Sequence, residues 1–180
     1  MLEDKELTKK AKQGNAEAFG LLYDKHLNQI YRFVYLKVSN KQIAEDLTQQ
    51  VFLSAWQNIN SYQHQGFPFT SWLYRIARNA VIDHYRTSRS HIGLEAISEL
   101  SDFSDLVGKL ENKLELGKIK IALASLTQDY QDVIVMRFIE ELSHQEIAAA
   151  LNKSEGAVRV LQHRAINSLK KIINNNGKFS

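Results

Sequence analysis

The chain has 180 residues, with no cysteine, one proline and eight glycines. Without cysteine it has no disulfide framework and no thiolate metal site. With so few glycines and prolines it lacks the turn chemistry of an all-β fold. The N-terminus is polar, and no apolar run reaches the roughly 18 residues of a membrane helix. The composition therefore predicts an all-α, cytoplasmic protein without membrane insertion.

The net charge of +3 is unevenly distributed along the chain. Residues 1–90 carry +4, residues 91–115 carry −4 and residues 116–180 carry +3. Two basic blocks on either side of an acidic one would suit a polyanionic partner. Ordinary solvated surfaces would give the same pattern, and charge alone favours that simpler interpretation.

Helical periodicity dominates the first block. Apolar residues recur every three or four positions over residues 19–34, and this stripe predicts a long amphipathic helix with Asn15 as its N-cap. The polar pair Ser39-Asn40 interrupts the pattern. A second apolar stripe over residues 43–59 then predicts a second helix.

A loop and a third helix follow, rich in aromatic rings and arginines. Gly66 and Pro68 predict a loop between residues 60 and 69, and Thr70 or Ser71 is the predicted cap of the helix after it. Rings can stack on unpaired bases while arginines follow the nucleic-acid backbone. Many of these rings would serve equally well as core, so this segment alone leaves both interpretations open.

The composition changes over residues 88–115, where serines and acidic residues mix and no long periodic pattern survives. A structureless connection of this length is uncommon inside one compact domain. We therefore predict a domain at residues 1–89, a flexible acidic linker at 90–115 and a second helical domain at 116–180.

The second domain contains the pattern of a helix-turn-helix. Ser143 and Glu146 fit a capping box, Asn152 suits the left-handed turn, and Ser154 can cap the next helix. The residues predicted to face outward from that helix are Glu155, Arg159, Val160, His163 and Arg164. A recognition helix places its N-terminal half in the major groove, which favours DNA binding over a helical hairpin with a solvated basic face.

Four stretches of the chain carry a resemblance to a known family. Residues 44–52 (AEDLTQQVF) and 69–79 (FTSWLYRIARN) resemble the second conserved region of bacterial RNA polymerase sigma factors. Residues 142–148 (LSHQEIA) and 156–165 (GAVRVLQHRA) resemble their fourth region. The length and the missing middle domain match the extracytoplasmic-function (ECF, group 4) branch of the sigma-70 family.

The resemblance implies a polymerase-binding surface and two DNA-reading surfaces. It assigns binding of core polymerase, at the β′ clamp helices, to Asp46, Gln49, Gln50 and Phe52. It assigns the −10 element, including an unpaired non-template base, to Tyr62, Phe67, Arg75, Arg78, Asn79, Asp83 and Arg86. It assigns the −35 element to Ser154, Glu155, Ala157, Arg159, Val160, His163 and Arg164. Gln50 departs from the pattern, because relatives usually carry Glu there.

The resemblance further implies contact of the second domain with the polymerase β flap and passage of the linker by the active centre. It also allows for an anti-sigma partner. No catalytic, metal or cofactor site is predicted, and the chain is not expected to be an enzyme. Two alternatives remain from the residues alone: a helix-turn-helix regulator that acts without polymerase, and a helical adaptor that binds only proteins.

Overall fold

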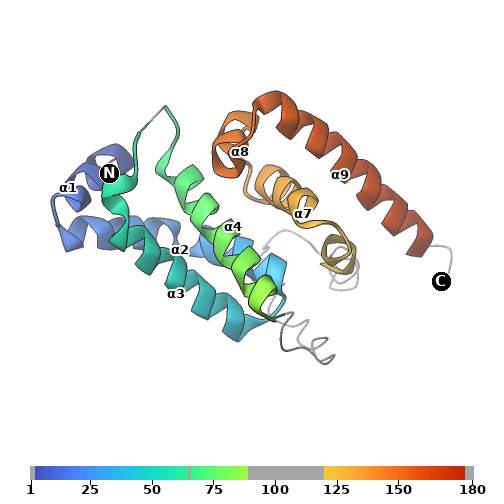
Figure 1. Ribbon diagram of the computed structural model, residues 1–180, viewed down its shortest axis with the longest axis horizontal. Coiled ribbons are helices and arrows are strands. Elements are labelled where there is room, and N and C mark those ends of the chain that lie inside the picture. Colours follow the sequence, from blue (N-terminus) through green and yellow to red (C-terminus); the bar gives the residue numbers. More distant parts are fainter. Residues whose placement is uncertain (1–2, 65, 89–119, 177–180) are drawn as a thin grey trace.

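The computed structural model describes residues 3–64, 66–88 and 120–176, and the all-α prediction is confirmed there because these residues form helices and no strand. The helices fall into two groups (Figure 1). The N-terminal helices are α1 (Asp4–Lys12), α2 (Ala16–Val38), α3 (Lys41–Gln57), the short η1 (Ile59–Ser61) and α4 (Phe69–Ser88). The C-terminal helices are α7 (Gln128–Ile134), η2 (Val135–Ile139), α8 (His144–Leu151) and α9 (Glu155–Asn176). The whole predicted linker, 90–115, lies outside the described residues, so the domain boundaries stay predictions.

Local side-chain caps define the starts of α2 and α3. The Asn15 side chain accepts a hydrogen bond from the backbone N–H of Ala18 at 2.8 Å, which confirms the predicted cap. Ser39 ends α2 in the left-handed conformation, and Asn40 caps α3 by accepting from Ile43 at 3.0 Å. The predicted break at Ser39-Asn40 is therefore a tight turn between antiparallel neighbours.

The predicted cap of the third helix was wrong by two or three residues, because the residue before α4 is Pro68. α4 begins at Phe69, so Thr70 and Ser71 lie inside its first turn. Ser71 is 2% exposed, and its Oγ is buried without a hydrogen-bond partner. Phe69 is only 1% exposed. Its packing into the core explains why the helix begins before the predicted cap.

The C-terminal helices contain the predicted helix-turn-helix. Ser143 and Glu146 form the reciprocal capping box at the start of α8. Asn152 closes α8 in the left-handed conformation, with φ of 54°. Ser154 then accepts from the N–H of Ala157 at 3.2 Å. These three features make a compact turn that fixes the direction of α9.

The two groups of helices pack directly against each other (Figure 1). α4 lies along α8, and one continuous cluster of buried apolar side chains extends from Leu22 and Phe33 in α2 to Met136 and Ile147 in the C-terminal helices. A smaller cluster between α7 and α9 includes Ala165. Within the described parts of the chain, no helix is long and apolar enough to cross a membrane.

Candidate nucleic-acid interface

The N-terminal half of α9 presents an exposed polar face. Val158 and Ala165 are fully buried and hold the opposite face of the helix against the core. Because of that packing, the predicted outward set is indeed exposed: Glu155, Arg159, Val160, His163 and Arg164. Ala157 is half-buried. Ser154 is exposed, but its hydroxyl accepts the hydrogen bond that caps α9.

The polar groups on this face make only short-range contacts with each other. The Arg159 side chain is 65% exposed, and its Nη2 lies 3.4 Å from a carboxylate oxygen of Glu155 one turn earlier. His163 lies 3.1 Å from the amide of Asn167. Exposed ion pairs of this kind contribute little to stability. The Arg159 guanidinium can therefore exchange its carboxylate partner for a base edge or a phosphate at low cost.

A second exposed face lies along the C-terminal half of α4. Asn79, Asp83 and Arg86 are all exposed there. Asp83 and Arg86 form an exposed ion pair at 3.2 Å, with side chains 61% and 77% accessible. These three predicted −10 residues thus share a solvent-facing stripe that a strand of nucleic acid can reach.

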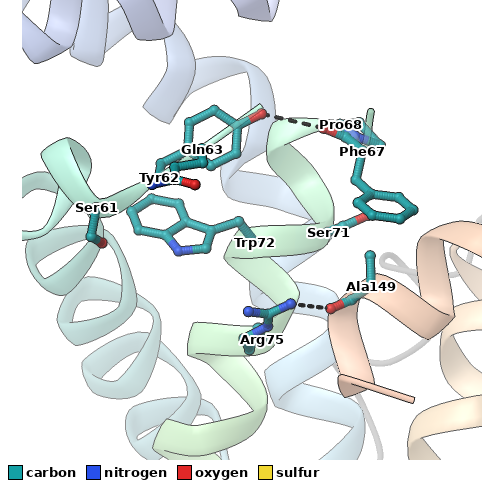
Figure 2. Close-up of a pocket in the computed structure, with 9 residues that line it drawn as sticks. All are labelled: Ser61, Tyr62, Gln63, Phe67, Pro68, Ser71, Trp72, Arg75 and Ala149. Atoms are coloured by element: carbon teal, nitrogen blue, oxygen red, sulfur yellow. Dashed lines mark hydrogen bonds between the residues drawn. The ribbon is translucent and has the colours of Figure 1, made fainter. Parts of the chain in front are cut away.

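A cavity of about 150 Å³ opens at the N-terminal end of α4 (Figure 2). Tyr62 and Trp72 form one wall, with ring centroids 5.4 Å apart, and Phe67 faces them across the opening. Tyr62 is 5% exposed and its hydroxyl donates to the carbonyl of Phe67 at 3.3 Å. Burial raises the pKa of Tyr62, so it stays a hydrogen-bond donor. Flat aromatic walls of this kind suit a stacked base.

Two arginines of the predicted −10 set have partners in the C-terminal helices. The Arg75 guanidinium donates to the backbone carbonyl of Ala149 in α8 (Figure 2). Arg78 donates through Nε to Asp132 and through Nη2 to Asp129, both at 2.7 Å. Burial lowers the pKa of Arg78, but the hydrogen bonds that Arg78 donates to the two carboxylates, together with their negative charge, outweigh burial, so the pKa rises and the charge is retained. The predicted −10 set is therefore split between a solvent-facing part and an interface.

Sequence reasoning missed the carboxylates in this interface. Asp132 is fully buried and also pairs with the buried Lys37 of α2. The Glu140 carboxylate accepts hydrogen bonds from Nε and Nη2 of Arg32, both at 2.7 Å, and from the Tyr74 hydroxyl at 3.0 Å. Burial and then Glu140 raise the pKa of Tyr74, and the hydrogen bonds to Glu140 raise that of Arg32. No local pattern marks these partners, because they lie far apart along the chain.

Three of the four residues assigned to polymerase binding lie on the exposed side of α3, and the fourth lies on its buried side. Asp46, Gln49 and Gln50 are exposed, whereas Phe52 is 3% exposed and packs edge-on against Tyr23 at 4.7 Å. Phe52 thus supports the helix from within. Leu53, which the sequence analysis did not select, is 57% exposed. Leu53 lies on the exposed face of α3 with Asp46, Gln49 and Gln50, and a single exposed apolar side chain is common on protein surfaces.

A groove of about 510 Å³ between α3 and α4 joins two of the predicted surfaces. Gln50 of α3 lines it together with Asn79 and Asp83 of α4. Residues assigned separately to polymerase and to DNA therefore lie on one continuous face. A partner that enters this groove can contact both sets at once.

Comparison with known proteins agrees with this arrangement. The family model of sigma-70 region 2 matches residues 22–91, and that of sigma-70 region 4 matches residues 122–171. The solved structure of CnrH in complex with the cytosolic domain of CnrY is similar to this one, with a TM-score of 0.70 and 28% identity over 96% of this chain and 97% of that one. The sigma factor RpoE from Bartonella quintana, solved in complex with the anti-sigma factor NepR, shares the fold, with a TM-score of 0.71 and 22% identity over 88% of this chain and 98% of that one.

Two curated relatives cover nearly the same part of the chain. The ECF RNA polymerase sigma factor BldN of Streptomyces coelicolor is 36% identical over 93% of this chain, which spans 65% of the length of BldN. The ECF RNA polymerase sigma factor SigW of Bacillus subtilis is 34% identical over 93% of this chain and 95% of its own length. With both conserved regions matched in order, the chain belongs to the ECF sigma factors, the family that directs RNA polymerase in promoter-specific transcription initiation.

Proposed function

We propose that this sigma factor binds core RNA polymerase and reads a −35 element with α9 and a −10 element with α4. The exposed, basic N-terminal half of α9 carries the proposal, because its geometry is that of a recognition helix behind a capped turn. Arg159 is the proposed base reader, while Arg164 and Lys170 would hold phosphates. Ser154, Glu155, Ala157, Val160 and His163 complete the proposed −35 surface.

For the −10 element we propose capture of unpaired bases. Asn79, Asp83 and Arg86 form the solvent-facing stripe, and the aromatic cavity beside Tyr62 offers a stacking site for a base taken out of the duplex. Promoter opening then follows from differential affinity, because a protein that binds unpaired bases better than paired ones shifts the equilibrium toward the melted state. The chain itself performs no covalent step.

We assign polymerase binding to the exposed face of α3, with Asp46, Gln49, Gln50 and Leu53 as contacts to the β′ clamp helices and Phe52 as internal support. The helices of residues 116–180 are the proposed contact with the β flap. The predicted domains, 1–89 and 116–180, and the linker between them belong to this proposal. A cytoplasmic location follows from these partners. CnrH was solved in complex with the cytosolic domain of CnrY, and RpoE of Bartonella quintana in complex with the anti-sigma factor NepR. These complexes support an anti-sigma partner for this chain as well.

A transcription assay with purified core enzyme tests the proposal. Genomic fragments are transcribed by core polymerase with and without the chain, and the transcripts identify the promoter. We expect initiation that depends on the chain and on both promoter elements. Binding to duplex DNA without any effect on core polymerase would favour the stand-alone regulator, and binding to protein alone would favour the adaptor.

Asn79→Ala separates the proposed DNA contact from the polymerase contact in the same groove. We expect weaker promoter opening, measured by permanganate reactivity of unpaired thymines, with unchanged affinity for core enzyme. Asn174→Ala is the matched control, since Asn174 is exposed near the end of α9. If affinity for core polymerase falls instead, Asn79 belongs to the polymerase surface together with Gln50.

A further inference from the structure

The short helix α1 lies next to the segment that carries the aromatic cavity, and it contributes no residue to the three predicted surfaces. Its buried face includes Leu7 and Ala11, and the helix packs against α2, η1 and α4. Because η1 and the start of α4 border the cavity, α1 is placed to hold the segment between them. The side chain that reaches this segment is Lys12, the last residue of α1.

Lys12 makes two contacts with Tyr62. Its ammonium donates a hydrogen bond to the Tyr62 backbone carbonyl, and the same nitrogen lies 5.5 Å from the centroid of the Tyr62 ring. The first contact satisfies a carbonyl at the C-cap of η1, and the last carbonyls of a helix find no donor within it. The second places a cation over an aromatic ring, which attracts it electrostatically. One side chain therefore fixes both the backbone and the ring of Tyr62.

Tyr62 connects the Lys12 contact to both walls of the cavity (Figure 2). On one side the centroid of its ring lies 5.4 Å from that of Trp72 and 5.3 Å, edge-on, from that of Phe69. On the other side its hydroxyl donates to the carbonyl of Phe67 at 3.3 Å. A shift of Tyr62 would therefore change the spacing of the rings on which a base would stack.

The opposite end of α1 is anchored in α2. The Asp4 carboxylate accepts hydrogen bonds from Lys25 at 2.5 Å and from Nε2 of His26 at 2.8 Å. Nδ1 of His26 lies 2.5 Å from the amide nitrogen of Gln29, which can only donate, so the His26 ring is neutral with its proton on Nε2. Burial lowers the pKa of His26 by more than the charge of Asp4 raises it, in agreement with a neutral ring. Both ends of α1 are thus held in place.

These contacts form a closed series around the back of the cavity. The His26 ring lies 5.9 Å from that of Phe69, the first residue of α4, and Phe69 contacts Tyr62. The series therefore runs from Asp4 of α1 through α2 and α4 and returns to α1 at Lys12. A site whose walls are fixed before a ligand enters loses less conformational entropy on binding, so it binds more tightly.

Burial distinguishes Lys12 from another lysine of the same helix. Lys12 is half-buried, whereas Lys9 is exposed. An exposed lysine is free to attract DNA phosphates. The Lys12 ammonium is instead engaged with a backbone carbonyl and a ring, which favours a role within the protein.

We propose that Lys12 is a positioning residue for the capture of an unpaired base: it holds Tyr62, and through Tyr62 the carbonyl of Phe67, at the spacing that the base requires. This inference rests on the proposed role of the aromatic cavity in −10 recognition. Lys12 itself touches no base. Loss of its ammonium should weaken capture of the base and leave binding to core polymerase and to the −35 element unchanged.

Lys12→Met tests the proposal, because it keeps an aliphatic side chain and removes the ammonium. Holoenzyme is titrated with labelled fragments of the promoter found by transcription, duplex at the −35 element and single-stranded over the non-template −10 element. An abasic site is placed at each −10 position in turn. On the intact fragment the variant should bind about three- to tenfold more weakly than the parent chain. On the fragment that lacks the captured base, this difference should disappear, because that base is what the Lys12 contact helps to bind.

Two further variants control the experiment. Lys9→Met removes the same charge from the exposed side of α1 and should show no dependence on any abasic site. Lys12→Arg keeps a cation and hydrogen-bond donors and should restore most of the affinity. An equal loss for Lys12→Met on every fragment, which a phosphate contact or a general loss of structure would give, overturns the inference alone, as does full affinity on the intact fragment. If no abasic site weakens binding by the parent chain, the proposed base capture fails, and the inference falls with it.

Discussion

The two proposed DNA-reading surfaces contain the same side-chain type in opposite states. Arg159 of α9 is 65% exposed and pairs with Glu155 within its own helix. Arg78 of α4 is 20% exposed and is held by two carboxylates of α7. Arg159 is accessible to DNA without any rearrangement, whereas Arg78 must first lose its protein partners. The proposed DNA-reading surfaces of α9 and α4 therefore differ in solvent accessibility and not in residue type.

The largest expected effect is on the free energy of unfolding, and it comes from Asp132, which holds Arg78 of α4. Asp132→Ala leaves Lys37 buried without its carboxylate and takes one of two partners from Arg78. Uncompensated burial of a charge typically costs about 3–5 kcal/mol. Burial already lowers the pKa of Lys37, and Asp132 is the group that opposes this effect, so its loss adds to the cost. Urea unfolding should show this loss of stability.

Glu6→Ala is the control for that experiment. It breaks the exposed Lys10–Glu6 pair, whose side chains are 45% and 51% accessible, and exposed pairs contribute about 0–1 kcal/mol. If Asp132→Ala proves no more destabilising than Glu6→Ala, the contacts of Asp132 with Lys37 and Arg78 are loosely held. The restrained state of α4 would then be only a weak preference of the free chain.

The next largest expected effect is on the binding of −35 duplex by the exposed face of α9. Arg159→Ala should weaken binding of −35 duplex by about 1–3 kcal/mol and relax base preference at one position, because an arginine fork reads a guanine edge. The measurement is a titration of the parent −35 duplex and its single-base variants. Arg164→Ala serves as the comparison, since loss of a phosphate contact weakens all sequences alike.

The same experiment distinguishes the two surfaces. Because α9 is already exposed, Glu140→Gln should leave −35 affinity unchanged. A uniform loss over all duplex variants would show that Arg159 contacts phosphate only. An increase of −35 affinity in the Glu140→Gln variant would mean that α9 is restrained too, which would remove the difference between the surfaces.

Sequence reasoning succeeded where structure is local. The Asn15 cap, the Ser143 and Glu146 capping box and the turn at Asn152 each depend on residues a few positions apart, and all three are present. The exposed face of α9 followed from helical periodicity in the same way. Such features can be read from one sequence because the interacting groups are neighbours along the chain.

It failed where contacts are remote. Arg32 and Glu140 are 108 residues apart, and Arg78 and Asp132 are 54 apart, so no spacing rule joins them. Asp132 also lies among apolar residues in the sequence. From the sequence alone, a single carboxylate there would be expected to face solvent. The placement of Phe52 in the core, and of Leu53 on the surface beside it, depends likewise on which neighbours pack against α3.

The smallest of these effects tests whether the accessible surface depends on local structure alone. Ser143→Ala removes the side-chain acceptor for the N–H of Glu146 and should cost about 1 kcal/mol of stability in urea unfolding. Ser168→Ala in α9 is the matched control and should cost less, because alanine favours the helix interior. Ser143 lies outside the predicted −35 set, so the affinity of the folded variant for −35 duplex should not change. A loss of −35 affinity in the folded variant would mean that the cap of α8 also helps to position α9, so that the accessible surface depends on more than its own helix.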